Sequence, residues 1–305
     1  MDEQGWLAER FEEQRGRLRA VAYRMLGSLS EADDAVQETW LRASRADTSA
    51  VDNLGGWLTT ITARVCLNML RAGVARRAEP LDPYTPEPVI DPASGASPEH
   101  EVLLADAVGL ALLVVLQSLN PPERLAFVLH DMFDLPFDEI APIVERTPEA
   151  TRQLASRARR RVRGGGAPAP DGDPVAARIA VDAFLAAARQ GDLAALIAVL
   201  HPDVLHRTHR GAAGGTTQLR GAATVARQAV AFSQAGLVVV PVLINGAPGI
   251  VSLRDGQPFS VLAFTVIDGS IAEIDALLDP GRLAQLDLSA VDHRPGPVAG
   301  AQPAS

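Results

Sequence analysis

The sequence contains no lysine, only one cysteine, and no apolar run long enough to cross a membrane. All 28 basic residues of the 305-residue chain are arginine. GC-rich codons produce this bias, so it reflects the base composition of the genome and not the function of the protein. The lone Cys66 excludes a disulfide within the chain and a cysteine-based zinc site, which favours a reducing compartment. The longest apolar runs, at 110–116 and 237–244, fall far short of the roughly 20 residues of a membrane-spanning helix.

The start of the sequence also lacks the apolar core of a signal peptide, because it is charged from Asp2 onward. With 47% hydrophobic and 21% charged residues, the composition is that of ordinary globular domains, which excludes global disorder. These observations predict a cytoplasmic protein without a membrane partner.

Two segments rich in proline, glycine and aspartate, at 76–99 and 164–174, are typical of linkers. We therefore predict a multidomain chain with two all-α domains followed by an α+β domain. The expected divisions are a helical domain at 1–78, a linker at 79–98, a second helical domain at 99–164, a linker at 165–173, an α+β domain at 174–290 and a disordered tail at 291–305.

The first domain contains a strong helical pattern at 31–44, with apolar and small residues recurring at helical spacing. This pattern places Asp34, Gln37 and Glu38 on the faces that are not buried. Ser30 is the predicted N-cap, and three acids are expected in the first turn, where the helix dipole favours them.

A further helix is predicted at 56–71. Its periodicity buries Ile61 and Val65 together with Trp57, for which a core position and a base-stacking position are about equally supported. The same periodicity projects three polar side chains outward: Arg64, Asn68 and Arg71.

The second domain is predicted to open with an apolar helix at 102–119, followed by a helix that Asn120 caps and that begins at Pro121 or Pro122. A short helix at 137–144, a tight turn at 145–147 and a third helix that opens at Pro148 have the order and lengths of a helix-turn-helix.

In the third helix, Leu154, Ala158 and Val162 recur every four residues and form the packed stripe. Between 146 and 163 there are seven arginines against one glutamate, a local charge of +6 in a chain of net charge −9. Such a stripe is typical of a phosphate-binding surface. The residues left available to a nucleic acid are Arg152, Gln153, Ser156, Arg157 and Arg160.

The third domain changes character from helices to strands. Helical periodicity at 175–190 and a second helix to residue 200 precede strand-like runs at 237–244, 249–253, 259–267 and 270–278, with Asp268-Gly269 as a hairpin turn. Helices followed by an antiparallel meander predict an α+β fold.

Two of these segments resemble a known family. RLRAVAYRMLGSLSEADDAVQETWLRA (17–43) resembles region 2 of the extracytoplasmic-function sigma factors, and SLNPPERLAFVLHDMFDLPFDEIAPIVERTPEATRQLASRARRRV (118–162) resembles their region 4. The order and spacing agree as well. The third domain resembles the SnoaL-like fold, a cone with a curved antiparallel sheet that is shared with nuclear transport factor 2.

The resemblance implies a subunit of RNA polymerase that recognises two promoter elements and helps to open the duplex. It implies that Asp34, Gln37 and Glu38 contact the clamp of the largest subunit of the core polymerase. The residues implied at the minus-10 element are Asn53, Trp57, Arg64, Asn68 and Arg71. The residues implied at the minus-35 element are Thr151, Arg152, Gln153, Ser156, Arg157 and Arg160.

The third domain departs from the family pattern in two segments. Where the family carries Asp-Gly-Gly-Gly-Lys, this chain has THRGAAGG (208–215), and where it carries Asn-Pro-Asp-Lys-Leu, this chain has DPGRL. The family's Pro-Glu-Pro signature is partly matched by TPEP (85–88). We predict that the second segment is regulatory, through Asp279, Pro280, Arg282 and Leu283.

Other functions remain open from the residues alone. His201, His206 and His209 gather near Asp203, so proton transfer or a small-molecule ligand in the third domain is an alternative to a purely protein-contacting role. Strand alternation puts His206 and Thr208 on one face and Arg207 and His209 on the other. We predict no enzyme activity, no catalytic residue, no metal and no cofactor, and a monomer in the free state. The main rival is a one-component DNA-binding regulator that does not bind polymerase.

Overall fold

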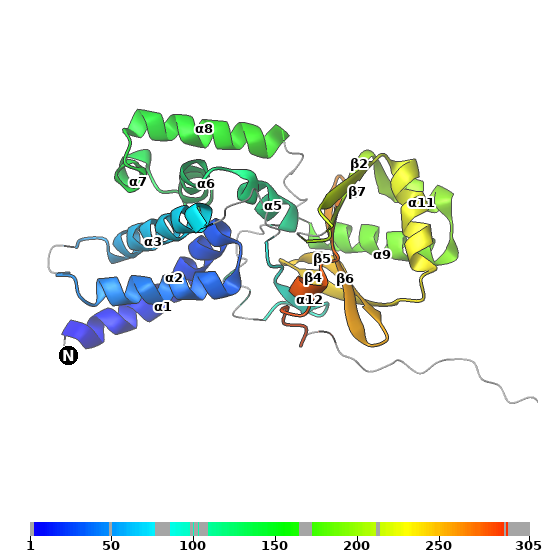
Figure 1. Ribbon diagram of the computed structural model, residues 1–305, viewed down its shortest axis with the longest axis horizontal. Coiled ribbons are helices and arrows are strands. Elements are labelled where there is room, and N and C mark those ends of the chain that lie inside the picture. The colour runs from blue at the N-terminus through cyan, green and yellow to red at the C-terminus, as the bar shows by residue number, and fades with distance from the viewer. Residues whose placement is uncertain are drawn as a thin grey trace, which may run out of the picture.

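The structure, a computed structural model, describes residues 3–48, 51–76, 86–97, 100, 103, 109–164, 173–211, 214–289 and 291. A helical half and an α+β half lie side by side (Figure 1). This arrangement confirms the predicted fold class. No helix in the described ranges is both long enough and apolar enough to cross a membrane.

The first helical unit consists of α1 (Glu3–Leu26), α2 (Leu29–Ala43) and α3 (Leu54–Arg76), and each helix packs against the other two. The predicted cap of α2 is wrong by two residues. The helix begins at Leu29, and Ser28 accepts the hydrogen bond from the amide of Glu31. As a result, only Glu31 among the acids lies in the first turn, and Asp33 and Asp34 follow one turn later.

The second helical unit consists of α5 (Leu110–Ser118), α6 (Pro121–Phe127), a π-helical turn η1 (Val128–Met132), α7 (Phe137–Val144) and α8 (Pro148–Gly164). The predicted helix at 102–119 is interrupted. Leu103 is helical, but Gly109 has an extended backbone and is the N-cap of α5, and 104–108 lie outside the described residues. Asn120 caps α6 as predicted, with its side-chain oxygen 2.9 Å from the amide of Glu123.

The helix-turn-helix is confirmed. Glu145 ends α7 in the left-handed conformation, with φ of 59°, and the Thr147 hydroxyl caps α8 by accepting from the amide of Ala150. The chain therefore reverses within the predicted tight turn.

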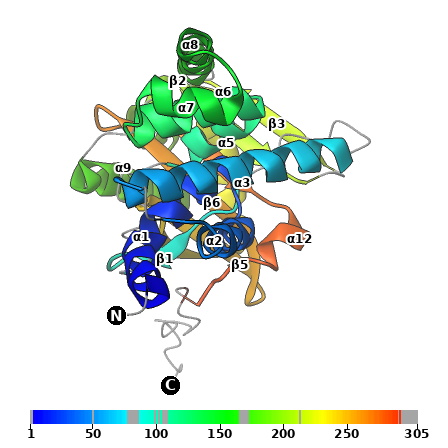
Figure 2. The ribbon, with the colours of Figure 1, turned by 90° about the vertical axis from the view of Figure 1, so that its left-hand side faces the viewer.

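The two helical units share one apolar core. The helix α3 of the first unit lies against α6 and α7 of the second (Figure 2). Arg124 of α6 is buried in this junction. Its guanidinium donates to the carbonyl oxygen of Met25 at the end of α1 and to the side chain of Gln117, both at 2.7 Å. A buried cation that is satisfied by carbonyl oxygens across two units orients them specifically.

The α+β half contains α9 (Pro174–Gln190), α10 (Leu193–Val199), β2 (Leu200–His209), β3 (Thr216–Arg220), α11 (Ala222–Ser233), β4 (Val238–Ile244), β5 (Ala247–Arg254), β6 (Gln257–Ile267), β7 (Ser270–Leu277) and α12 (Pro280–Leu283). With β1 (Ile90–Pro92), which comes from the linker between the helical units, the described strands form one seven-stranded sheet in the order β1-β4-β5-β6-β7-β2-β3.

The predicted meander is confirmed for β4 to β7, which are antiparallel neighbours. The sheet as a whole is mixed, because β2 runs parallel to β7. Asp268-Gly269 forms the predicted turn with φ of 49° and 72°, and the φ angles of Asn245-Gly246 (51° and 78°) and Asp255-Gly256 (52° and 76°) are similar. Three tight turns of one kind therefore set the register of the meander.

The helix α9 buries only part of the face that its periodicity predicts. Of the recurring apolar residues Val175, Ile179, Ala183, Phe184 and Ala187, only Phe184 and Ala187 are fully buried. Val175 and Ile179 are 66% and 65% exposed, whereas Ala180, Val181 and Phe184 pack into the core. The buried face is set by contact with α10, α11 and the sheet, which the local pattern does not encode.

The linker between the helical units contributes a strand, which the sequence did not predict. β1 (Ile90–Pro92) pairs antiparallel with β4 at the edge of the sheet, with Ile90 opposite Ile244. A segment that precedes the helix-turn-helix is therefore built into the third domain.

Candidate nucleic-acid interface

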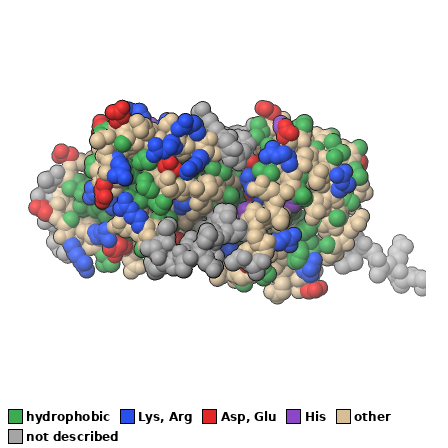
Figure 3. Space-filling model, turned by 45° about the horizontal axis from the view of Figure 1, so that its top comes forward, with side chains coloured by type: hydrophobic (Ala, Val, Ile, Leu, Met, Phe, Trp, Pro, Cys, Tyr) green, Lys and Arg blue, Asp and Glu red, His purple; other side chains and the backbone are tan. Residues whose placement is uncertain are grey.

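The outward face of α8 carries the polar residues that the sequence predicted. Arg152, Gln153, Ser156, Arg157 and Arg160 are all exposed, and Leu154, Ala155 and Ala158 form the buried stripe. Arginine side chains gather over this part of the helical half (Figure 3). Arginine and glutamine can form paired hydrogen bonds with base edges, and serine suits phosphate.

Thr151 is the exception, and its prediction as a DNA contact is wrong. The side chain is fully buried, and its hydroxyl donates to the carbonyl oxygen of Thr147 at 2.9 Å. The residue lies one helical turn before Ala155, on the packed side of α8.

Two carboxylates that the sequence analysis missed hold three of the arginines. The buried Glu123 of α6 pairs with Arg157 at 2.9 Å and with Arg161 at 2.6 Å, and Asp131 pairs with Arg159 at 2.5 Å. Glu123 is 3% exposed, whereas Arg157 remains 45% exposed. The pairs attach α8 to α6 and to η1, and they lower the positive charge of the surface.

The polar face of α3 forms a second stripe. Positions 57, 64, 68 and 71 are spaced so that they project from one side of the helix over roughly 21 Å. Arg64, Asn68 and Arg71 are exposed as predicted. Trp57 is half-buried against the core of the first unit, and Asn53 is exposed while its side-chain oxygen caps the helix at the amide of Gly56.

The acidic face of α2 lies away from the core. Asp34 and Gln37 are exposed, and Glu38 is half-exposed and paired with Arg42 at 2.7 Å. Leu41 continues the same face and is 40% exposed. Two carboxylates, an amide and an uncovered leucine on one helix face are a combination suited to a basic protein surface with an apolar centre.

The two altered segments of the third domain meet in space. Asp279 caps α12, and Gly211 lies so close to it that an added Cβ atom would stand 2.2 Å from the Asp279 carboxylate. Leu283 is buried in a cluster with Ile90 of β1 and Leu110 of α5. The segment from Asp279 to Leu283 therefore contributes to the junction between the two halves.

The predicted histidine group is divided by the sheet. His206 and Thr208 line a cavity on one face, as alternation predicts, and His209 lies on the other face with its Nε2 3.4 Å from Asp275. His201 is exposed near the start of β2. Within the described ranges, no three His, Cys, Asp or Glu side chains are grouped so that they could hold a metal ion.

Arg207 lies between two buried carboxylates on that second face. Its guanidinium is 2.6 Å from Glu273 and 2.7 Å from Asp275. Burial raises the pKa of Glu273 to about 7, because the single cation does not fully compensate both acids. Burial acts against ionisation of Asp275 as well, but hydrogen bonds from His209 and Arg207 hold its pKa below the ordinary value.

Two family models match the helical half: Sigma-70 region 2 over residues 10–76 and Sigma-70 region 4 over residues 109–162. Together with the acidic helix face and the helix-turn-helix, these matches define a sigma factor and not an enzyme.

The relatives narrow the class. The ECF RNA polymerase sigma factor SigJ of Mycobacterium tuberculosis (strain ATCC 25618 / H37Rv) is 35% identical over 295 residues, which cover 89% of this chain and 91% of that protein. The probable ECF RNA polymerase sigma factor SigI of the same strain is 33% identical over 272 residues, covering 87% of this chain and 91% of that protein. The chain belongs to the ECF RNA polymerase sigma factors.

A solved structure extends the likeness to the third domain. The crystal structure of Mycobacterium tuberculosis SigJ matches with a TM-score of 0.70 and 31% identity, covering 91% of this chain and 98% of that chain. The α+β half has a mixed, mostly antiparallel open sheet, and the match to the SigJ structure extends over most of the chain, this half included.

Proposed function

We propose that the chain binds core RNA polymerase through α2, reads promoter DNA through α3 and α8, and is modulated in cis by its third domain. The observation that supports DNA reading most directly is the outward face of α8, where five predicted polar side chains are exposed on a helix that two ion pairs attach to Glu123 of α6. A factor that binds polymerase acts in the cytoplasm, where that enzyme transcribes.

At the minus-35 element we assign base or phosphate contact to Arg152, Gln153, Ser156, Arg157 and Arg160. At the minus-10 element we assign contact to Asn53, Trp57, Arg64, Asn68 and Arg71. Trp57 is half-buried, so in this assignment one edge of its ring packs in the core and the other edge faces the DNA.

The proposed modulation in cis is supported by the contacts that hold the linker. Glu87 accepts from the amide of Leu29 at 2.9 Å and donates its own amide to the carbonyl of Gly27 at 2.8 Å. A few residues later, Val89 and Asn245 exchange hydrogen bonds at 3.0 and 2.8 Å, and β1 joins β4. The linker is thus bonded both to the first helical unit and to the α+β half. These bonds shorten the free length of the linker, so they restrain how far α3 and α8 can separate.

The test of the whole proposal is transcription in vitro with core polymerase and a library of random promoters. We expect the full chain to select two sequence elements at a preferred separation. Deletion of residues 165–305 should broaden the range of separations that support transcription, because the linker is then no longer fastened. No transcript from any promoter would refute the sigma role, and an unchanged promoter profile after deletion would refute modulation in cis.

Replacement of Arg157 by alanine tests the base-reading assignment. If Arg157 contacts a base edge, the promoter complex should weaken by about 1–3 kcal/mol and lose preference at one position. Transcription from templates altered base by base in the minus-35 element measures both effects. Arg161→Ala is the matched control, since it removes the other ion pair of Glu123 without removing a predicted base contact. Uniform weakening across all templates would assign Arg157 to phosphate instead.

A further inference from the structure

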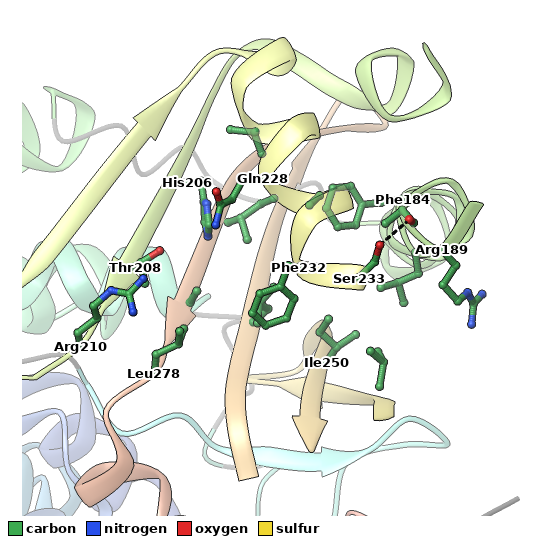
Figure 4. Close-up of a pocket in the computed structure, with 18 residues that line it drawn as sticks. Phe184, Arg189, His206, Thr208, Arg210, Gln228, Phe232, Ser233, Ile250 and Leu278 are labelled. Carbon is green, nitrogen blue, oxygen red and sulfur yellow. Dashed lines mark hydrogen bonds between the residues drawn. The ribbon is translucent and has the colours of Figure 1, made fainter. Parts of the chain in front are cut away.

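The third domain encloses a cavity of about 120 Å³ between the inner face of the sheet and the helices α9 and α11 (Figure 4). Most of its wall is aliphatic or aromatic. The apolar side chains include Phe184, Val225, Phe232, Ile250, Leu262 and Ile274. An engineered apolar cavity of about 150 Å³ holds one benzene molecule, so this space fits a single ring.

One polar group at the wall is left without a partner. Both ring nitrogens of His206 are buried and have no hydrogen-bond partner within the described parts of the chain. In Figure 4 the imidazole points into the cavity beside the amide of Gln228, which comes from α11. Buried polar atoms in native proteins are nearly always paired, so two ring nitrogens without a partner at a cavity mark a position where a ligand can form hydrogen bonds.

The charge of the groups around the cavity indicates whether its ligand is charged or neutral. Burial lowers the pKa of His206, so its ring is neutral at pH 7 and offers one donor and one acceptor. The two arginines of the wall, Arg189 and Arg210, are exposed at its rim. The inner part of the cavity therefore presents hydrogen bonds without a fixed charge.

The same geometry does not favour catalysis. The residues that line the cavity include no carboxylate, and Asp275 lies on the opposite face of the sheet, where it is bonded to Arg207 and His209. His206 thus has no carboxylate hydrogen-bonded to its ring, and the charge of Asp275 across the sheet, which favours the protonated ring, is outweighed by burial, which lowers the pKa of His206.

We propose that this cavity binds a neutral organic molecule about the size of one six-membered ring, whose hydroxyl or carbonyl group hydrogen-bonds to His206. The ring replaces empty space against the apolar wall, and the polar group satisfies the imidazole. Any effect of this ligand on transcription rests on the proposed role of the third domain in cis, whereas binding itself does not.

Calorimetry of the purified full-length chain with phenol and with toluene tests the proposal. The two molecules have similar size and shape, and phenol alone carries a hydroxyl. We expect phenol to bind about tenfold more tightly than toluene, because only phenol satisfies the buried imidazole. Absence of phenol binding up to about 10 mM would overturn the proposal. Tighter binding of benzoate than of phenol would also overturn it, since it would mean that the rim arginines select an anion.

Two variants locate the site. His206→Leu should abolish the preference for phenol while leaving toluene binding, and Ala229→Phe should abolish binding of both by filling the cavity. His206→Gln, which keeps hydrogen-bonding groups, should retain part of the preference and covers the case in which His206→Leu does not fold. An unchanged phenol preference in folded His206→Leu refutes the assignment.

The outcomes separate this site from the function in cis. A chain that binds phenol but whose promoter profile does not respond to deletion of the third domain contradicts the cis role alone. A chain whose profile responds to that deletion but which binds no phenol contradicts the cavity site alone.

Discussion

Reversal of charge at Asp34 and Glu38 together is expected to detach this sigma factor from core polymerase. Both side chains lie on the outward face of α2, next to the exposed Leu41. If this face meets a basic surface, two arginines in place of two carboxylates put like charges in contact, which costs several kcal/mol. We expect Asp34→Arg/Glu38→Arg to weaken association by about 2–4 kcal/mol, measured by co-purification and by titration of labelled sigma factor with core enzyme.

The control for this experiment is available on α1. Glu12 and Glu13 are exposed and form ion pairs with arginines of their own helix, so Glu12→Arg/Glu13→Arg makes the same change of net charge on a neighbouring surface. The ion pair that the test variant loses, Glu38 with Arg42, contributes only about 0.3–0.5 kcal/mol to folding. Both variants should therefore melt near the parent temperature. Equal loss of binding in the two variants would show that net charge, and not the α2 face, controls association.

Much of the fold could be predicted from local chemistry. The helix-turn-helix was located because Phe137–Val144 and the helix from Pro148 carry periodic apolar residues around a short polar turn. The strands of the meander were found because Asp-Gly turns separate runs of β-branched residues. In both cases the signal lies within ten or so residues, a range over which sequence and backbone conformation are directly linked.

The errors came from contacts between distant segments. Ile90 pairs with Ile244 of β4, which lies more than 150 residues later in the chain. The proline-rich sequence around β1 does not indicate that this segment forms a strand there. Glu123 lies 34 residues before Arg157, so nothing in the α8 pattern indicated that the arginine surface is partly neutralised. Thr151 was assigned to DNA from the resemblance, whereas its position relative to Leu154, Ala155 and Ala158 already places it on the packed side. That last error was avoidable from helix geometry alone.

Replacement of Asn245 by glycine should release the linker from the third domain. The buried amide of Asn245 accepts from the backbone of Val89 at 3.0 Å and donates to the hydroxyl of Tyr23 at 3.1 Å. Tyr23 in turn donates to the carbonyl of Glu87 at 2.5 Å. One side chain therefore connects the first helix, the linker and the β4–β5 turn.

Glycine is the informative substitution because Asn245 has a φ of 51°, which glycine adopts without strain. The variant removes the side chain and leaves the turn. Burying the Val89 amide without an acceptor should lower the free energy of unfolding by about 1–3 kcal/mol. The added flexibility of glycine in the unfolded chain should lower it by up to about 1 kcal/mol more. Chemical denaturation measures the sum.

Asp255→Gly provides the matched control, since Asp255 occupies the same position of an equivalent turn with a φ of 52° and an exposed side chain. Its free energy of unfolding should fall only by the amount that the flexibility of glycine causes. Hydrogen exchange then separates local release of the linker from general destabilisation of the protein. The Val89 amide should exchange roughly 30-fold faster in Asn245→Gly, a factor that corresponds to about 2 kcal/mol. In Asp255→Gly the same amide should remain protected. With the linker released, transcription should tolerate a wider range of separations between promoter elements. A Val89 amide that stays protected in Asn245→Gly would mean that β1 holds the linker without this side chain, and the restraint would then have to be sought in the strand pairing itself.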